Sequence, residues 1–168
     1  IVPSWATAPD AEAINLVLDP GLAFGTGSHP STRMCLLWLE RTIRGGERVL
    51  DYGCGSGILA IAALRLGASA ALGVDVDPRA LVAAQANAER NRVDARFFNT
   101  ETAPDIQADL VVANILANPL ILLAPLLAAH SGPGGRIALS GILESQAQEV
   151  MAAYAPWFAM RFCAHDGE

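Results

Sequence analysis

The sequence contains no lysine, so all eleven of its basic residues are arginines. Seventeen acidic residues outnumber them and give a net charge of -6. Affinity for phosphate backbones depends on clustered Lys and Arg, so an acidic chain of this kind is a poor candidate for direct binding to nucleic acid. A basic macromolecular partner would fit its charge better.

Long apolar runs are also missing, since none reaches the roughly 18 residues that a membrane span needs. The three cysteines, Cys35, Cys54 and Cys163, form no C-x-x-C pair, which argues against a disulfide framework and against a zinc site. We therefore expect no membrane contact, no metal and a cytoplasmic location. No secretory signal can be recognised, and a first residue other than Met suggests a fragment of a longer chain.

Short apolar runs alternate with helical patterns from residue 48 onward. The predicted strands are 48–51, 71–76, 95–98, 109–113, 136–140 and about 159–164, and the predicted helices are 58–66, 77–90, 119–129 and 145–154. This alternation predicts βαβ units and a mostly parallel sheet with helices on both faces, the doubly wound, Rossmann-like α/β class. A further helix is predicted at 31–43, with Met34, Leu37 and Trp38 on its apolar side and Leu39 as a further candidate for that side. A turn is predicted at Gly134–Gly135.

A glycine cluster, D-Y-G-C-G-S-G at 51–57, follows the first predicted strand. In open α/β sheets the loop after this strand lies at the ligand crevice, where glycines let the backbone turn tightly and approach the ligand. A dinucleotide site would need a third glycine where Ile58 stands, and no P-loop G-K-[ST] is present. A nicotinamide or ATP site is therefore disfavoured.

Asp75 stands at the end of the second predicted strand, where an acid commonly accepts hydrogen bonds from ribose hydroxyls. A role as a turn cap is the alternative, and Asp77 is the predicted N-cap of the next helix.

D-x-G-x-G-x-G followed by this acid resembles the class I S-adenosylmethionine-dependent methyltransferases. The resemblance implies that the loop of Gly53 and Gly55 faces the amino-acid part of the cofactor and that Asp75 faces its ribose. Asp51 would support the loop or reach the cofactor ammonium through water, and a purely structural role for it is equally open.

The fourth predicted strand ends in N-I-L-A-N, at 114–118. In amino-methylating members of this class, an Asn at this place accepts a hydrogen bond from the incoming nitrogen, together with nearby backbone carbonyls. Asn114 and Leu116 are therefore the candidate catalytic residues, although Asn114 could instead satisfy backbone groups at the strand end. The commoner motif has Asn-Pro-Pro-aromatic, so the absence of an aromatic here favours a flexible aliphatic amine over a planar substrate.

One longer motif, L-D-P-G-L-A-F-G-T-G-S-H-P-S-T-R at 18–33, is more specific than the glycine loop. Together with G-V-D-V-D-P and V-V-A-N-I-L-A-N-P-L it resembles the ribosomal protein L11 methyltransferases, the PrmA family, over essentially the whole chain. The resemblance implies methyl transfer from S-adenosylmethionine, with S-adenosylhomocysteine as product, to Lys ε-amines and the N-terminal α-amine of that ribosomal protein. The cofactor contacts that it implies are Thr32, Gly53, Asp75 and Asn114, with Phe24, Gly25 and Thr26 closing over the cofactor.

The resemblance also divides the chain into a linker and lid loop at 1–30 and a cofactor-binding catalytic domain at 31–168. His29 receives no catalytic role, because a lone His in a turn more often bonds to the backbone. Family members carry a separate N-terminal substrate-recognition domain and a final antiparallel strand, and we expect this chain to lack both. Three alternatives stay open: a methyltransferase of a small amine or of another protein, a cofactor-binding fragment without activity, and a dehydrogenase.

Overall fold

The computed structural model of the chain describes residues 1–18 and 29–163. Five parallel strands form one sheet in the order β3-β2-β1-β4-β5. The strands are β1 (Arg48–Tyr52), β2 (Ala70–Asp75), β3 (Arg96–Asn99), β4 (Ala108–Asn114) and β5 (Ser131–Ser140). The helices are α1 (Pro30–Thr42), α2 (Ile58–Arg65), α3 (Pro78–Asn91), α4 (Ala117–His130) and α5 (Ala147–Tyr154), with a 3-10 turn, η1 (Glu144–Gln146), before α5.

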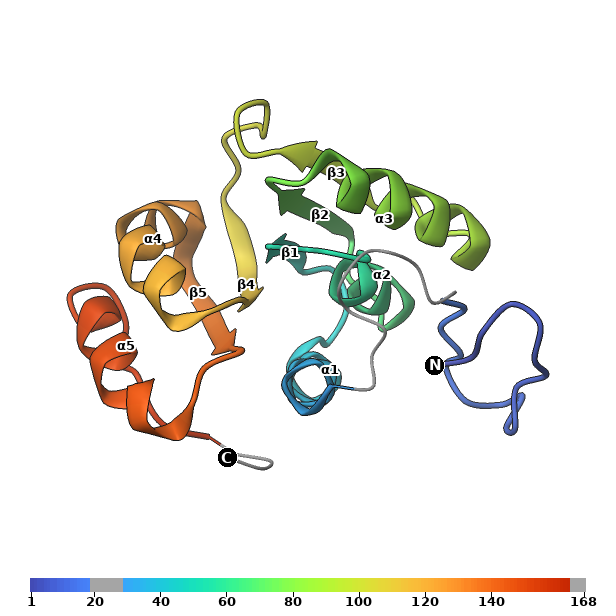
Figure 1. Cartoon of the computed structure of the whole chain (residues 1–168), viewed down its shortest axis with the longest axis horizontal. Coiled ribbons are helices and arrows are strands. Elements are labelled where there is room, and N and C mark those ends of the chain that lie inside the picture. The colour runs from blue at the N-terminus through green and yellow to red at the C-terminus, as the bar shows by residue number, and fades with distance from the viewer. Residues whose placement is uncertain (19–28, 164–168) are drawn as a thin grey trace.

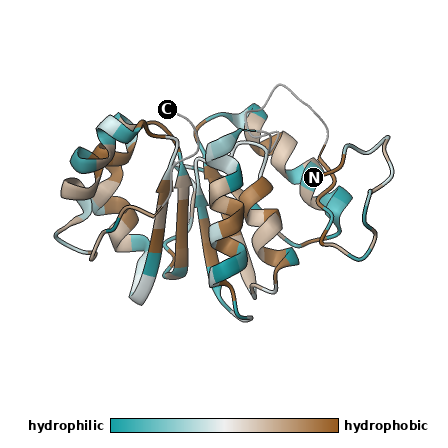
Figure 2. Cartoon of the chain, turned by 90° about the horizontal axis from the view of Figure 1, so that it is seen from below, coloured by the Kyte–Doolittle hydropathy of each residue, from teal (hydrophilic) through white to brown (hydrophobic). Residues whose placement is uncertain are grey.

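Helices cover both faces of the sheet, as the sequence predicts. Helices α1, α2 and α3 lie on one side and α4 and α5 on the other (Figure 1). Successive side chains of a strand point to opposite faces, so Val49 joins the core under α1 and α2 while Leu50 joins the core under α4. Residues 110–113 of β4 are accordingly all apolar and buried, and Figure 2 shows hydrophobic residues along the strands, which is typical of a parallel sheet buried on both sides.

The strand order reverses between β1 and β4. The chain passes outward from β1 through β2 to β3 and then returns, so that β4 pairs with the free side of β1. Tyr52 pairs with Ala113, which brings the residues at the ends of these two strands to the same edge of the sheet. Ligands of open α/β sheets bind in the crevice at such a reversal.

Helix α1 begins as predicted, and its buried face matches the prediction in part. His29 is the N-cap, and its ring nitrogen Nδ1 accepts a hydrogen bond from the Ser31 backbone N–H at 3.3 Å. Cys35 and Leu39 are buried, whereas Leu37 is exposed. The prediction was therefore wrong for Leu37, whereas Leu39 is buried and Trp38 packs against the same core, as expected.

Two predictions near the end of the chain also need correction. The segment 132–135 is a bulge inside β5 rather than a turn before it, because Ser131 already pairs with Ala108 and pairing resumes at Leu110 and Arg136. The strand expected at 159–164 is not formed over 159–163, and residue 164 lies outside the described range. Phe158 and Met160 pack against the core under α4 and α5 instead.

Within the described residues, no helix has the length and apolarity to cross a membrane.

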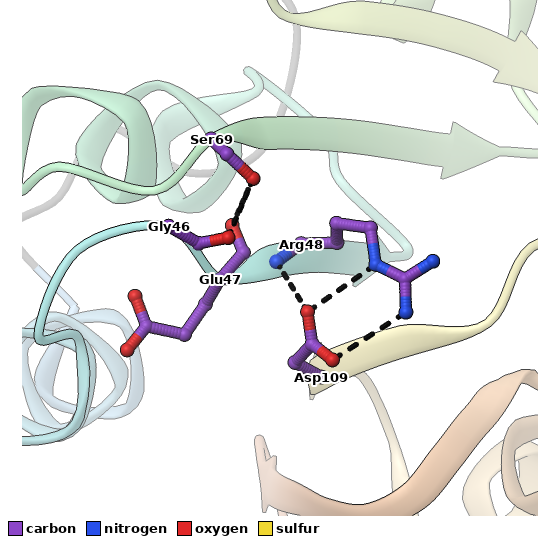
Figure 3. Close-up of polar contacts among 5 residues, drawn as sticks. All are labelled: Gly46, Glu47, Arg48, Ser69 and Asp109. Atoms are coloured by element: carbon purple, nitrogen blue, oxygen red, sulfur yellow. Dashed lines mark hydrogen bonds and ion pairs between the residues drawn. The ribbon is translucent and has the colours of Figure 1, made fainter.

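Polar contacts join the beginnings of three strands, at the edge opposite the crevice (Figure 3). The Asp109 carboxylate accepts hydrogen bonds from the Arg48 backbone N–H at 2.8 Å and from its guanidinium at 3.3 and 3.4 Å. The Ser69 hydroxyl donates to the Gly46 carbonyl at 2.6 Å. About half of each ion-pair side chain is exposed, 53% for Arg48 and 45% for Asp109.

We predict that Asp109→Asn costs less than about 1 kcal/mol, because exposed ion pairs are screened by solvent. The Arg48 guanidinium holds the pKa of Asp109 below its usual value. The stabilisation is therefore present above about pH 4 and lost as the pH falls through the lowered pKa. Urea denaturation from pH 3 to 7 tests this, with the exposed Asp94→Asn as the control. Equal loss of stability at pH 3 and pH 7 would contradict it.

Candidate active site

The glycine loop between β1 and α2 has the backbone conformation that its composition predicts. Gly53, Gly55 and Gly57 have φ values of 77°, 51° and 76°, in the left-handed region that other residues rarely adopt. A Cβ on Gly53 would overlap the Ile115 side chain, and one on Gly57 would meet Phe97 and Ala84. These two positions therefore require glycine for packing as well as for backbone geometry.

Asp75 connects this loop to the end of β2. One carboxylate oxygen accepts a hydrogen bond from the Gly55 N–H and the other from the Asp77 N–H, each at 2.9 Å. Asp77 is the N-cap of α3, as predicted, through a 2.9 Å bond from the Arg79 N–H. Asp75 thus organises the local turn, and a carboxylate has acceptor capacity beyond these two bonds.

Asp51 is a carboxylate that the fold buries almost completely, with 1% of its surface exposed. One oxygen accepts a hydrogen bond from the Ala60 N–H at 3.1 Å, in the first turn of α2. The other oxygen, Oδ1, has no hydrogen-bond partner among the described residues. Burial raises the pKa of Asp51 to about 7, and the negative charge of Asp75 acts in the same direction. A buried acceptor without a partner fits a donor that arrives with a ligand.

Asn114, at the end of β4, contacts the beginning of α1. Its amide Nδ2 donates to the Thr32 hydroxyl at 3.2 Å, and Thr32 is itself buried. Next to this pair, the Ser140 hydroxyl at the end of β5 donates to the Ser31 carbonyl at 3.3 Å. The structure therefore brings the predicted residues Asn114 and Thr32 together and fixes α1 over the ends of β4 and β5.

Gly141 and Ile115 also lie in this site, although neither is predicted from the sequence. Gly141 has a φ of 80°, and a Cβ there would lie 2.8 Å from the Ile115 carbonyl oxygen and 3.0 Å from Asn114 Oδ1. The turn after β5 therefore lies directly against the Asn114 amide. A Ser-Gly pair at a strand end was the available signal, but its contact with a distant strand was not readable from it.

The remaining predicted residues divide into two groups. Leu116 precedes α4 and is 73% exposed, so its side chain borders the site rather than supporting it. Phe24, Gly25 and Thr26 lie outside the described residues. Among residues 1–18 and 29–163, no group of three or more His, Cys, Asp and Glu side chains is arranged to hold a metal ion.

A parallel sheet of this order, with a glycine loop after β1 and an acid after β2, is the fold of the class I methyltransferases. One structure of similar fold is a SAM-dependent methyltransferase from Thiobacillus denitrificans in complex with S-adenosyl-L-homocysteine, with a TM-score of 0.53 and 26% identity over 66% of this chain and 49% of that one. Within this class the chain belongs to the ribosomal protein L11 methyltransferase (PrmA) family, whose sequence model matches residues 1–168.

Individual relatives agree with the family assignment. The ribosomal protein L11 methyltransferase of Cupriavidus metallidurans is 62% identical over 160 residues, which are 95% of this chain and 53% of that protein. The ribosomal protein L11 methylase of Lactobacillus delbrueckii subsp. bulgaricus has a TM-score of 0.84 and 36% identity over 98% of this chain and 88% of the solved one. The chain spans about half the length of the sequence relatives that it matches.

We predict that Asp51→Asn stabilises the ligand-free chain at pH 8. The folded chain keeps the Asp51 proton up to about pH 7, whereas an unfolded Asp ionises near pH 3.9. Stability therefore falls as the pH rises from about 4 to 7 and stays reduced above that. The gain has an upper bound of about 4 kcal/mol at pH 8 and is small at pH 4.

Chemical denaturation at pH 4 and pH 8 measures this difference. Asp109→Asn is the matched control, since the same substitution there removes a stabilised carboxylate and has the opposite sign at pH 8. A loss of stability in Asp51→Asn at pH 8 would show that the buried carboxylate is not a cost to the ligand-free fold.

Proposed function

We propose that this chain is the cofactor-binding catalytic part of an S-adenosylmethionine-dependent enzyme that methylates ribosomal protein L11. The observation that carries the proposal is the meeting of the Asp51, Asp75 and Asn114 positions at the carboxyl ends of β1, β2 and β4, where the strand order reverses. Family membership and the names of the relatives support it. The division into a linker and lid loop at 1–30 and a catalytic domain at 31–168 is part of the same proposal.

The site residues fit this cofactor by their chemistry. Gly53 and Gly55 would hold its amino-acid part close to the backbone, and Asp75 would accept hydrogen bonds from its ribose hydroxyls. Asp51 Oδ1, a buried acceptor without a partner among the described residues, would bind its ammonium group directly or through water. The remaining proposed contacts are Thr32, Asn114, Phe24, Gly25 and Thr26. When bound, the cofactor supplies a sulfonium methyl group that is open to attack by a nitrogen.

The substrates that we propose are Lys ε-amines and the N-terminal α-amine of the ribosomal protein. A Lys amine has a reference pKa of about 10.4, so it must lose its proton before it can react. Exclusion of water from the site lowers the pKa of the Lys amine. The amine releases its proton to solvent before it reacts. The oxygen of the neutral Asn114 amide and nearby backbone carbonyls, including that of Leu116, would accept hydrogen bonds from the N–H groups of the neutral amine and so orient its lone pair.

The segment 114–118 contains no acid, which suits repeated methylation. A carboxylate beside the acceptor nitrogen would stabilise the ammonium form and slow each transfer. An amide and carbonyls can instead hold a nitrogen that carries fewer hydrogens after every methyl group. A reducing cytoplasmic setting and the absence of nucleic-acid and membrane contacts belong to this proposal as well.

Calorimetric titration of the chain with S-adenosylmethionine, S-adenosylhomocysteine and NAD tests the cofactor assignment. We expect both adenosyl compounds to bind and NAD not to bind, because Ile58 stands where a dinucleotide loop needs glycine. Preference for NAD would overturn the proposal. Activity of the full-length protein on ribosomal protein L11 but not on small amines then separates the proposed substrate from its alternatives.

We predict that Asn114→Ala and Gly141→Ala lower the kcat of the full-length enzyme by about tenfold or more, roughly the effect of losing one well-placed contact to the reacting group. Gly141→Ala acts by displacing the Asn114 amide, a proposed cofactor contact, so it should also weaken binding of S-adenosylhomocysteine, and by no more than Asn114→Ala does. Gly134→Ala is the matched control: its φ of 74° carries the same backbone strain, and no atom lies within 4 Å of the added Cβ.

Equal kcat values in Gly141→Ala and Gly134→Ala would show that contact with the amide is unimportant. Wild-type kcat and cofactor affinity in Asn114→Ala would remove the role proposed for Asn114.

A further inference from the structure

Two buried amides on α3 take no part in the proposed chemistry. Asn87 and Asn91 lie one helical turn apart, and each is 4% exposed. The Asn87 oxygen accepts from the Arg90 guanidinium at 3.1 Å, and its nitrogen donates to the Ser56 carbonyl at 2.9 Å. Burying an amide is costly unless it is hydrogen-bonded, so the partners of these two amides indicate what they hold in place.

Asn87 contacts the glycine loop itself. Ser56 lies between Gly55 and Gly57, so the bond from Asn87 holds the loop backbone from the side of α3. Ala84, one turn earlier on α3, is one of the two residues that a Cβ on Gly57 would meet, the other being Phe97. Helix α3 therefore supports the loop at two successive residues.

Asn91 binds the N-terminal arm, which we define as residues 1–18. Its oxygen accepts from the Val17 N–H at 2.8 Å and its nitrogen donates to the Val17 carbonyl at 2.7 Å. The same nitrogen donates to the Asn87 backbone carbonyl at 2.8 Å. A single side chain thus satisfies both polar groups of Val17, as a neighbouring strand would.

The arm is otherwise held by its own bonds and by apolar burial. The Val2 N–H donates to the Leu16 carbonyl, and the Leu18 N–H donates to the Val2 carbonyl. Leu16 and Leu18 are buried in the core that α1 and α2 share, and the arm lies beside α2 and α3 (Figure 1). Asn91 is therefore a specific polar attachment between the arm and the helix that supports the glycine loop.

We propose that Asn87 and Asn91 are positioning residues that couple docking of the N-terminal arm to the conformation of the glycine loop. Residues 1–18 then act on the cofactor-binding domain in addition to their proposed place in the linker. The physical connection is short: the Asn87 side chain donates to Ser56, and the Asn91 amide bonds both to the Asn87 backbone carbonyl and to Val17. The first two bonds are buried and those to Val17 are part-buried, and one turn of α3 joins the two amides, so the position of each limits the other. The choice of S-adenosylhomocysteine as the probe ligand rests on the proposed function.

The coupling predicts that the purified chain binds S-adenosylhomocysteine more weakly when either amide is replaced by alanine than it does as wild type. We expect the Kd to rise about tenfold in Asn87→Ala and about threefold or more in Asn91→Ala, by the usual relation of lost hydrogen bonds to affinity. Gln85→Ala, on the exposed side of the same helix, is the matched control and should bind as wild type does. Thermal melting of each variant separates loss of affinity from loss of fold.

Hydrogen exchange supplies a second measurement that does not depend on the Asn91 variant folding. Coupling between two sites is reciprocal, so S-adenosylhomocysteine should slow exchange of the Val17 amide in wild type. The slowing should be lost in Asn87→Ala even at saturating ligand. Unchanged Kd values in both variants, or no slowing at Val17 when wild type is saturated, would overturn the coupling. Absence of binding by the wild-type chain would instead overturn the proposed function.

Discussion

The parallel pairing of β1 with β4 is the constraint on which the site depends. It forces the chain to return across the sheet after β3, and it aligns the carboxyl ends of the two strands. Asp51 and Asn114 then point to the same face of the sheet, because the side chains of paired residues share a face and those of alternate residues share it too. Helix α1 covers that face and contacts Asn114 through Thr32. No local propensity of either strand could create this arrangement alone.

Polar groups at the beginnings of the strands differ in exposure and in hydrogen bonding from those at the ends of the strands. At the beginnings of the strands, Arg48 and Asp109 are half exposed and form an ion pair. Their desolvation therefore costs little free energy, and the pair contributes little to the stability of the fold. At the ends of the strands, Asp51 is fully buried and only half satisfied. A fold selected for stability alone would not keep such a carboxylate in its centre. The distribution therefore agrees with a site that is completed by a ligand, and it identifies the edge at which that ligand would bind.

The fold class and most elements could be predicted because each depends on local patterns. The alternation of apolar runs with helical segments reports the burial of each element, and Asp77 is recognisable as a helix cap. His29 bonds to the backbone as expected, although its role as the cap of α1 is seen only in the structure. The buried face of α1 was not predictable in the same way. Leu37 is larger than Cys35, yet Cys35 is buried and Leu37 is exposed, because the side of α1 that faces the sheet is set by tertiary contacts such as that of Thr32 with Asn114. Likewise, Met160 lies in a segment with the pattern of a strand. In the structure it packs, together with Phe158, against the core under α4 and α5.

In the candidate site, residues could be selected from the sequence where a local motif marks them, and could not where only a tertiary contact does. Gly53, Gly55 and Asp75 stand out in the sequence because a tight glycine turn after one strand and an acid after the next are both typical of a ligand crevice. Gly141 carries no such signal, since its importance lies in its closeness to Asn114 in another strand.

Asn87 and Asn91 extend this distinction, because in the sequence they look like ordinary polar residues of an exposed helix. Their bonds to Ser56 and Val17 appear only once distant segments are folded together. A buried amide is unfavourable unless its partners are correctly placed, so the long-range bonds that make these residues hard to recognise in the sequence also make the position of the glycine loop specific.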